Sequence, residues 1–212
     1  MPRTEAVAQR TYGGRSAADR RAERRQRLLK AGLELFGTEG YAAASIEKLC
    51  THAGVSTRNF YEEFTSREEL LIALHVTVIE RSFKAVTLAF ENARDAPLSE
   101  RYELAVRAFI TTTASDPRWA RLSYVEVIGV SDVVERHRIA WRERWSAFLV
   151  AEANRAVARG EAQPRDFRLG TVALIGAVNE VVHHYSISNG RITLDEVIAE
   201  IVRLAMATVT AP

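Results

Sequence analysis

The residues with the clearest capacity for chemistry are the basic side chains at the start of the chain. Residues 1–30 hold nine arginine or lysine side chains against three carboxylates, a net charge of +6, whereas the whole 212-residue chain carries only +2. The remaining 182 residues therefore carry −4. A basic end on a slightly acidic body indicates a polyanion as the partner of that end. The alternative is that these arginines only solvate the outer face of a helix.

A second pattern, in residues 45–64, bears on which polyanion this is. Residues 45–53 have the periodicity of a short amphipathic helix, with the apolar side chains on one face. Gly54 can take the left-handed conformation that ends a helix sharply, and Ser56 can cap the next helix, over residues 57–64. Two short helices joined by a glycine turn form a helix-turn-helix, whose second helix enters the major groove of DNA.

The surrounding residues make this pattern specific. Residues 20–72 resemble the DNA-binding domain of the tetracycline-repressor (TetR) family. The residues that carry the resemblance are, in chain order, Ala31, Leu35-Phe36, Gly40-Tyr41, Ser45-Ile46, Leu49, Ala53-Gly54-Val55-Ser56, Phe60-Tyr61, Phe64, Ser66-Arg67-Glu68 and Leu70-Leu71. The rest of the chain resembles the family only in length and helical layout.

The resemblance implies DNA contacts for the polar residues around the second helix. Thr57, Arg58 and Asn59 would face base edges, where arginine pairs with guanine and asparagine with adenine. Tyr61 would bond a phosphate through its hydroxyl group; the alternative is an aromatic residue of the core. Side chains at helix starts would hold phosphates, aided by the helix dipoles. These residues are Ser45 and Arg67, with Tyr41 and Ser56 as weaker candidates.

Two positions depart from the pattern of the family. Cys50 stands where the family often has alanine, and we expect it to pack in the core rather than to sense redox state. Glu63 stands where the family often has histidine or tyrosine, a position that can approach phosphate. Because Glu62 and Glu63 would repel DNA, we expect them to pair with arginines such as Arg58 or Arg67, or to face solvent.

The C-terminal part supplies candidates for a small-molecule site. The resemblance implies that residues 67–212 form a helical domain that binds an effector. Aromatic side chains offer apolar area with a polar handle, and polar groups on the largely apolar helix 165–188 should line a cavity or contact a partner. The candidate pocket residues are Tyr102, Phe109, Trp119, Tyr124, Trp141, Trp145, Phe148, Asn179 and His183. We expect a hydrophobic or aromatic effector; plain core packing is the alternative for each aromatic residue.

The resemblance also implies that the last two helices form a homodimer. Small residues in 165–188 would allow close approach between helices, and residues 194–209 carry an apolar row. Two helices from each chain would then form a four-helix bundle. The candidate interface residues are Gly170, Ala173, Gly176, Ala177, Glu180, Val197, Ile201 and Leu204. Packing of the same stripes within one chain is the alternative.

Nine helices are expected to position these residues, because apolar residues recur at three- and four-residue spacing and prolines mark the boundaries. The expected ranges are 16–39, 45–53, 57–64, 67–93, 99–115, a short helix from 116, 132–159, 165–188 and 194–209. The fold class is all-α. The expected domains are a flexible basic arm (1–15), a DNA-binding domain (16–66) and a ligand-binding and dimerisation domain (67–212).

Composition and missing motifs exclude several classes of protein. Hydrophobic residues make up 47% and charged residues 26%, which excludes wholesale disorder. The single cysteine fits a reducing compartment, and no apolar run is long enough to span a membrane. His183 and His184 point about 100° apart on a helix, and Cys50 and His52 lack partners, so we expect no metal and no cofactor. No nucleophile elbow, phosphate-binding loop or dinucleotide motif indicates an enzyme.

Together these patterns favour a ligand-responsive transcriptional repressor in the cytoplasm. It would bind a pseudo-palindromic, double-stranded DNA operator as a homodimer and be released by a small-molecule effector. The alternatives are an activator or an effector-less regulator of the same family, and a helical adaptor whose helix-turn-helix binds protein.

Overall fold

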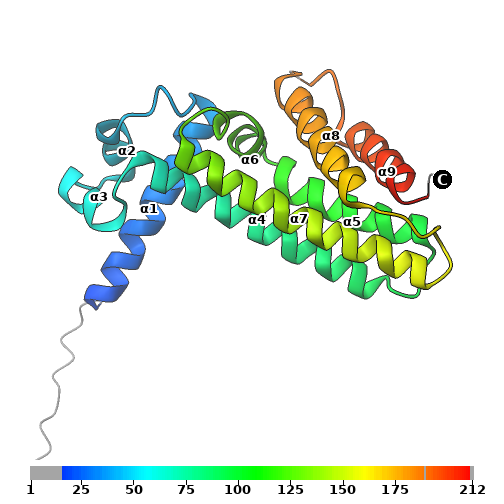
Figure 1. Cartoon of the computed structure of the whole chain (residues 1–212). Coiled ribbons are helices and arrows are strands. Elements are labelled where there is room, and N and C mark those ends of the chain that lie inside the picture. Colours follow the sequence, from blue (N-terminus) through cyan, green and yellow to red (C-terminus); the bar gives the residue numbers. More distant parts are fainter. Residues whose placement is uncertain (1–15, 189, 211–212) are drawn as a thin grey trace, which may run out of the picture.

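The computed structural model describes residues 16–188 and 190–210, and these residues form an entirely helical fold. The prediction of an all-α fold is confirmed, while the predicted basic arm, residues 1–15, lies outside the described residues. Nine α-helices and one π-helical turn follow one another in the described chain (Figure 1): α1 (Ala17–Thr38), α2 (Ile46–Ala53), α3 (Thr57–Glu63), α4 (Arg67–Asn92), α5 (Leu98–Ala114), α6 (Pro117–Arg121), η1 (Leu122–Glu126), α7 (Asp132–Ala158), α8 (Arg168–Ile187) and α9 (Leu194–Thr210).

Local signals in the sequence account for most helix starts. A serine side chain accepts a hydrogen bond from a backbone N–H in the first turn of α2, α3, α4 and α7, through Ser45, Ser56, Ser66 and Ser131. Gly54 has a φ of 61° and joins α2 to α3 in a left-handed turn, which a residue with a Cβ would strain. The predicted helix-turn-helix therefore forms from its own caps and its glycine.

One helix begins later than predicted, and another continues into a turn that was not predicted. The helix predicted from residue 165 begins at Arg168, because the Asp166 carboxylate accepts the Arg168 backbone N–H at 3.0 Å. An aspartate bonded to the backbone two residues ahead competes with helix formation. The short helix predicted from residue 116 ends at Arg121 and continues as the π-helical turn η1.

The first three helices form one end of the molecule. α1, α2 and α3 pack around a core with the start of α4, and α4, α5 and α7 extend away from it (Figure 1). This core reaches Leu74 on α4 and also takes in Leu122, Val127 and Val134. It therefore crosses residue 66, where the sequence predicts the domain boundary.

The other end of the molecule is built from α4, α5, α7, α8 and α9. Two further clusters of buried apolar side chains lie between these helices, and α8 packs beside α9 (Figure 1). No helix in the described ranges combines the length and apolar character needed to cross a lipid bilayer.

Candidate nucleic-acid interface and ligand cavity

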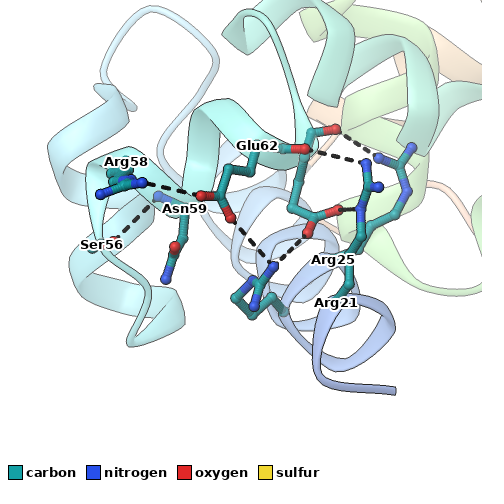
Figure 2. Close-up of polar contacts among 8 residues, drawn as sticks. Arg21, Arg25, Ser56, Arg58, Asn59 and Glu62 are labelled. Atoms are coloured by element: carbon teal, nitrogen blue, oxygen red, sulfur yellow. Dashed lines mark hydrogen bonds and ion pairs between the residues drawn. The ribbon is translucent and has the colours of Figure 1, made fainter. Parts of the chain in front are cut away.

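The start of α3 presents the side chains that were predicted to face DNA bases. Thr57 and Arg58 are exposed, and the Arg58 side chain keeps 90% of its accessible surface. Asn59 is half-buried, and its backbone N–H is donated to Ser56 Oγ at 3.2 Å (Figure 2). Tyr61 is 55% exposed and meets the buried Phe60 ring edge-on, so it is not a core aromatic.

The end of α3 is tied to α1 by a cluster that we call the α1–α3 clamp, made of Arg21, Arg24, Arg25, Glu62 and Glu63 (Figure 2). The Glu63 side chain is only 1% exposed and accepts hydrogen bonds from Arg21 Nε and Arg24 Nη2, both at 3.2 Å. Arg25 donates to the Glu63 carbonyl at 2.9 Å. Glu62 pairs with Arg24 at 3.4 Å.

The clamp changes the interpretation of the basic end. Three arginines of α1, which contribute to the charge that indicated a polyanion, bond the end of α3. Glu62 Oε1 lies 3.7 Å from Arg58 Nε, as one of the expected pairings had it. The expected pairing with Arg67 is wrong, because within the described part of the chain Arg67 bonds backbone carbonyls only.

The candidate phosphate contacts at the starts of α2 and α4 are positioned by one arginine. Arg67 Nη1 donates to the carbonyl oxygens of Tyr41 and Ala44, at 3.2 and 2.8 Å, and its guanidinium lies over the Tyr41 ring. Arg67 therefore supports the loop before α2, which holds Ser45 at the helix start. The Ser45 hydroxyl itself accepts the backbone N–H of Lys48.

Cys50 lies in the first core, where only 5% of its surface is exposed. Burial raises the pKa of its thiol, so the reactive thiolate is disfavoured at neutral pH. This position fits the expected packing role.

A cavity opens between α4, α5, α7, α8 and α9, and η1 forms part of its wall. The space open to the centre of a water molecule is about 130 Å³. One water needs roughly 10–15 Å³ on that measure, so the cavity could hold a small organic molecule. Most lining side chains are apolar. The predicted pocket residues that line it are Tyr102, Phe109, Tyr124, Trp141, Trp145 and Asn179.

Three predicted pocket residues lie elsewhere. Trp119 packs against the first core, because α6 lies on α1. Phe148 packs against the rings of Phe83 and Phe90, at centroid distances of 5.1 and 5.9 Å. His183 is half-buried on α8, outside the cavity lining. The prediction is wrong for these three residues, since helical spacing alone does not tell which side of a helix meets the cavity.

Three polar atoms of the cavity wall are buried and lack a hydrogen-bond partner among the described residues. They are Tyr102 Oη, Ser123 Oγ and Trp145 Nε1. Burial and the nearby Glu152 raise the pKa of Tyr102, so its hydroxyl stays neutral. An unpaired buried polar group costs about 1–3 kcal/mol. A bound molecule that pairs with these atoms would recover part of that cost.

One end of the cavity is lined by histidine and arginine. His75 Nδ1 lies 2.9 Å from His137 Nε2. Burial, His137 and Arg138 lower the pKa of His75 to about 3, and burial lowers the pKa of His137, so both rings are neutral near pH 7. Arg138 and Arg142 also line the cavity.

The predicted dimer residues divide into two groups. Val197 and Ile201 are 2% exposed and pack within the chain against α5 and α8, so the prediction that they contact a partner is wrong. A Cβ at Gly170 would lie 3.2 Å from Thr208, so this glycine serves packing between α8 and α9. Leu204 is half-buried on the second core.

The other candidates form an open face of α8. Ala173 and Glu180 are exposed, Ala177 is half-buried, and a Cβ at Gly176 would meet nothing within 4 Å. Three large apolar side chains continue this face at helical spacing: Leu169 (82% exposed), Val172 (48%) and Ile187 (53%).

Two family models match the chain. The model described as "Bacterial regulatory proteins, tetR family" matches residues 28–74. The model described as "Tetracyclin repressor-like, C-terminal domain" matches residues 95–209, which is more than half of the chain. The chain belongs to the TetR family. It is a transcriptional regulator with a helix-turn-helix DNA-binding domain.

Two curated relatives are named as helix-turn-helix transcriptional regulators. The transcriptional activator FasR of Mycolicibacterium smegmatis is 32% identical over 117 residues, which cover 54% of this chain and 52% of FasR. The transcriptional regulator EthR of the same species is 26% identical over 150 residues, which cover 69% of this chain and 68% of EthR. The match thus spans only about half the length of FasR.

Solved structures share the TetR fold at low identity. FadR of Bacillus subtilis, in complex with stearoyl-CoA, has a TM-score of 0.72 at 18% identity and covers 88% of this chain and 98% of its own. A TetR-family regulator of Syntrophomonas wolfei has a TM-score of 0.75 at 20% identity, with 90% and 97% covered.

Sequence reasoning missed several residues of this TetR-family site. Arg138 and Arg142 were not predicted, although Arg138 lies three residues before Trp141 and four residues before Arg142, spacings that place side chains on one face of α7. Leu169 and Val172 were missed although they lie on the same helical face as Gly176. The clamp had a weaker signal, since nothing in the sequence pairs Arg21 with Glu63.

Proposed function

We propose that the chain is a ligand-responsive transcriptional repressor that binds a pseudo-palindromic operator as a homodimer. The observation that carries this proposal is that one chain combines α3, held by the α1–α3 clamp, with a separate cavity. The wall of this cavity contains buried polar atoms that lack a hydrogen-bond partner among the described residues. Residues 16–66, with the first turns of α4 completing their core, would bind DNA. Residues 67–212 would bind the effector and the partner chain.

The DNA-binding half of the proposal rests on α3. Thr57, Arg58 and Asn59 would read base edges, and each good bidentate pair contributes about 1–3 kcal/mol of discrimination. Tyr61, Ser45 and Arg67 would lie near phosphates. In a dimer, two α3 helices about 34–36 Å apart would read successive faces of the major groove.

The effector half rests on the cavity. A filled core would favour a regulator without an effector. This interior instead holds about 130 Å³ of free space and buried polar atoms that have no partner among the described residues. FadR, which has the same fold, was solved in complex with stearoyl-CoA, a molecule with a long apolar acyl chain, and this supports a small-molecule effector with an apolar part. A coupling free energy of 1–3 kcal/mol would weaken DNA binding up to about 150-fold.

A mobility-shift assay with the DNA upstream of its own gene, at two salt concentrations, tests the proposal. We expect the chain to bind that DNA more tightly than a scrambled sequence, and to bind it more weakly at high salt. Arg58→Ala should lose discrimination at one base pair of each half-site, by roughly 5- to 150-fold. Arg81→Ala, an exposed arginine on α4, is the matched control. An Arg58→Ala variant with unchanged base preference would contradict the assignment.

Activation of transcription is a second candidate function, because one relative is a transcriptional activator. FasR is a transcriptional activator, and it is 32% identical to the aligned part of this chain. Transcription in vitro from the bound promoter separates the two, because a repressor lowers the transcript level and an activator raises it.

A further inference from the structure

The two ends of the cavity differ in chemistry. α4 and α7 run in the same direction along it, since His75 on α4 contacts His137 on α7, and Phe90 contacts Phe148 further along. His75 and Phe90 both line the cavity and lie 15 residues apart, roughly 22 Å along a helix. The lining is therefore elongated.

The end near His75 carries positive charge. Arg138 and Arg142 lie one turn apart on α7, and both line the cavity. Arg138 is paired with Glu135 and its side chain is only 17% exposed. Within the described residues Arg142 has no ion pair or hydrogen bond. Two cations face one carboxylate, so this end retains a positive charge.

The rest of the lining carries no charged side chain and is mostly apolar. Val86, Phe90, Leu149 and Ala205 line the far part and offer no charge. Trp145 lies between Phe83, Phe109 and Phe148, and its Nε1–H has no hydrogen-bond acceptor in the described part of the chain. A molecule along this path needs an apolar body and a hydrogen-bond acceptor for the indole N–H.

We infer that the cavity selects an anionic amphiphile: an elongated apolar body whose carboxylate or phosphate end pairs with Arg142 and Arg138. This inference rests on the proposed function, in which the cavity is the effector site. Guanidinium groups bond carboxylate and phosphate in the same bidentate geometry, so both head groups belong to the ligand class.

Ligands that share one chain and differ in head group test the inference. Decanoate, decyl phosphate, decanol and decyltrimethylammonium are titrated, below micelle formation, into the full chain without DNA, with tryptophan fluorescence as the readout. We expect decanoate or decyl phosphate, or both, to bind at least about tenfold more tightly than decanol, as loss of a charge-assisted bidentate pair predicts. The cationic ligand should bind weakest.

Arginine variants show which side chains cause the preference for anionic ligands. Arg142→Gln should bring the Kd of the anionic ligand close to that of decanol, and Arg142→Lys should keep part of the preference. Arg136→Gln, an exposed arginine of the same helix outside the cavity lining, is the matched control. Circular dichroism shows whether each variant is folded. If Arg142→Gln does not fold, Arg138→Gln takes its place in the test.

Three results would overturn the inference. They are equal binding of decanol and the anionic ligands, tighter binding of the cation, and no binding of any of the four. These results are separate from the fate of the proposed function. If the chain prefers anions but does not bind its upstream DNA, the inference holds and the repressor assignment fails.

Discussion

At the scale of single residues, the arginines of α1 show that charge and role are separate matters. Arg21, Arg24 and Arg25 contribute to the net charge of the first thirty residues, and each donates a hydrogen bond to the end of α3. Glu63 is the centre of this arrangement because its carboxylate is almost fully covered. A negative residue in a predicted DNA-binding helix is thus a structural anchor.

Glu63→Gln should destabilise the chain, because a neutral amide replaces a carboxylate that accepts from two guanidinium groups. Hydrogen bonds to charged groups contribute about 1.5–3 kcal/mol, so we expect the free energy of unfolding to fall by about 1–3 kcal/mol. Urea denaturation measures it. Glu62→Gln is the control, since that side chain is 46% exposed and should lose less than about 1 kcal/mol. Equal losses in the two variants would argue against the anchor.

His75 makes stability depend on pH in one direction. Its pKa is about 3 in the folded chain, against 6.5 for an unperturbed histidine. As the pH falls below 6.5, the unfolded chain takes up a proton at this position and the folded chain does not. The free energy of unfolding therefore falls with decreasing pH until the pH reaches about 3.

We expect this proton to lower the stability of the wild type by about 2 kcal/mol between pH 7.5 and pH 5, relative to His75→Leu. Urea denaturation at the two pH values gives the difference. His52→Leu, at an exposed position on α2, should follow the wild type. Parallel pH profiles of the wild type and His75→Leu would rule out His75 as the source.

At the scale of helices, α1 and α6 pack directly against each other. A Cβ at Gly37 would lie 2.5 Å from Arg118 Cβ and 2.8 Å from Arg118 Cα. The same arginine pairs with Glu34 on α1 at 2.6 Å. Glycine is therefore needed here for space, and α6 is held directly on the helix that carries the clamp.

Gly37→Ala should force α6 away from α1 and lower the free energy of unfolding by about 1–3 kcal/mol. Gly32→Ala on the same helix is the control. Its Cβ would meet only the side-chain ends of Leu74 and Leu70, at 3.0 and 3.1 Å, which can shift. The helix-propensity gain of up to about 1 kcal/mol should offset that cost. Urea denaturation of both variants measures the two losses. Similar midpoints for Gly37→Ala and Gly32→Ala would contradict this account.

Helices were easier to predict than their faces. Caps, prolines and glycines are local signals, and they placed most helix limits within about one residue. Which residues meet a cavity depends on how helices cross, which the sequence does not encode locally. Trp119 and Phe148 were therefore assigned to the pocket incorrectly, and Val197 and Ile201 to the dimer seam. The π-helical turn has no local signal that we recognised.

At the scale of the whole molecule, the exposed face of α8 is the strongest candidate for association. Leu169→Lys would place a charge at its most exposed apolar position. We expect the variant to shift from dimer to monomer in sedimentation velocity. Leu88→Lys, at a 44% exposed leucine of α4, should remain dimeric. A dimeric Leu169→Lys variant, or a monomeric wild type, would remove this face from consideration.

The π-helical turn has a consequence for how one short segment serves both ends of the molecule. On an α-helix, residues three apart share a face. In η1, Ser123 lines the cavity, while Glu126 accepts the Tyr41 backbone N–H at 2.7 Å beside the DNA-binding helices. The π-helical turn is wider and has an additional residue, so Ser123 and Glu126, three residues apart, can face different parts of the molecule. Removing that one residue would leave a regular helix able to serve the cavity wall or the Tyr41 loop, but not both.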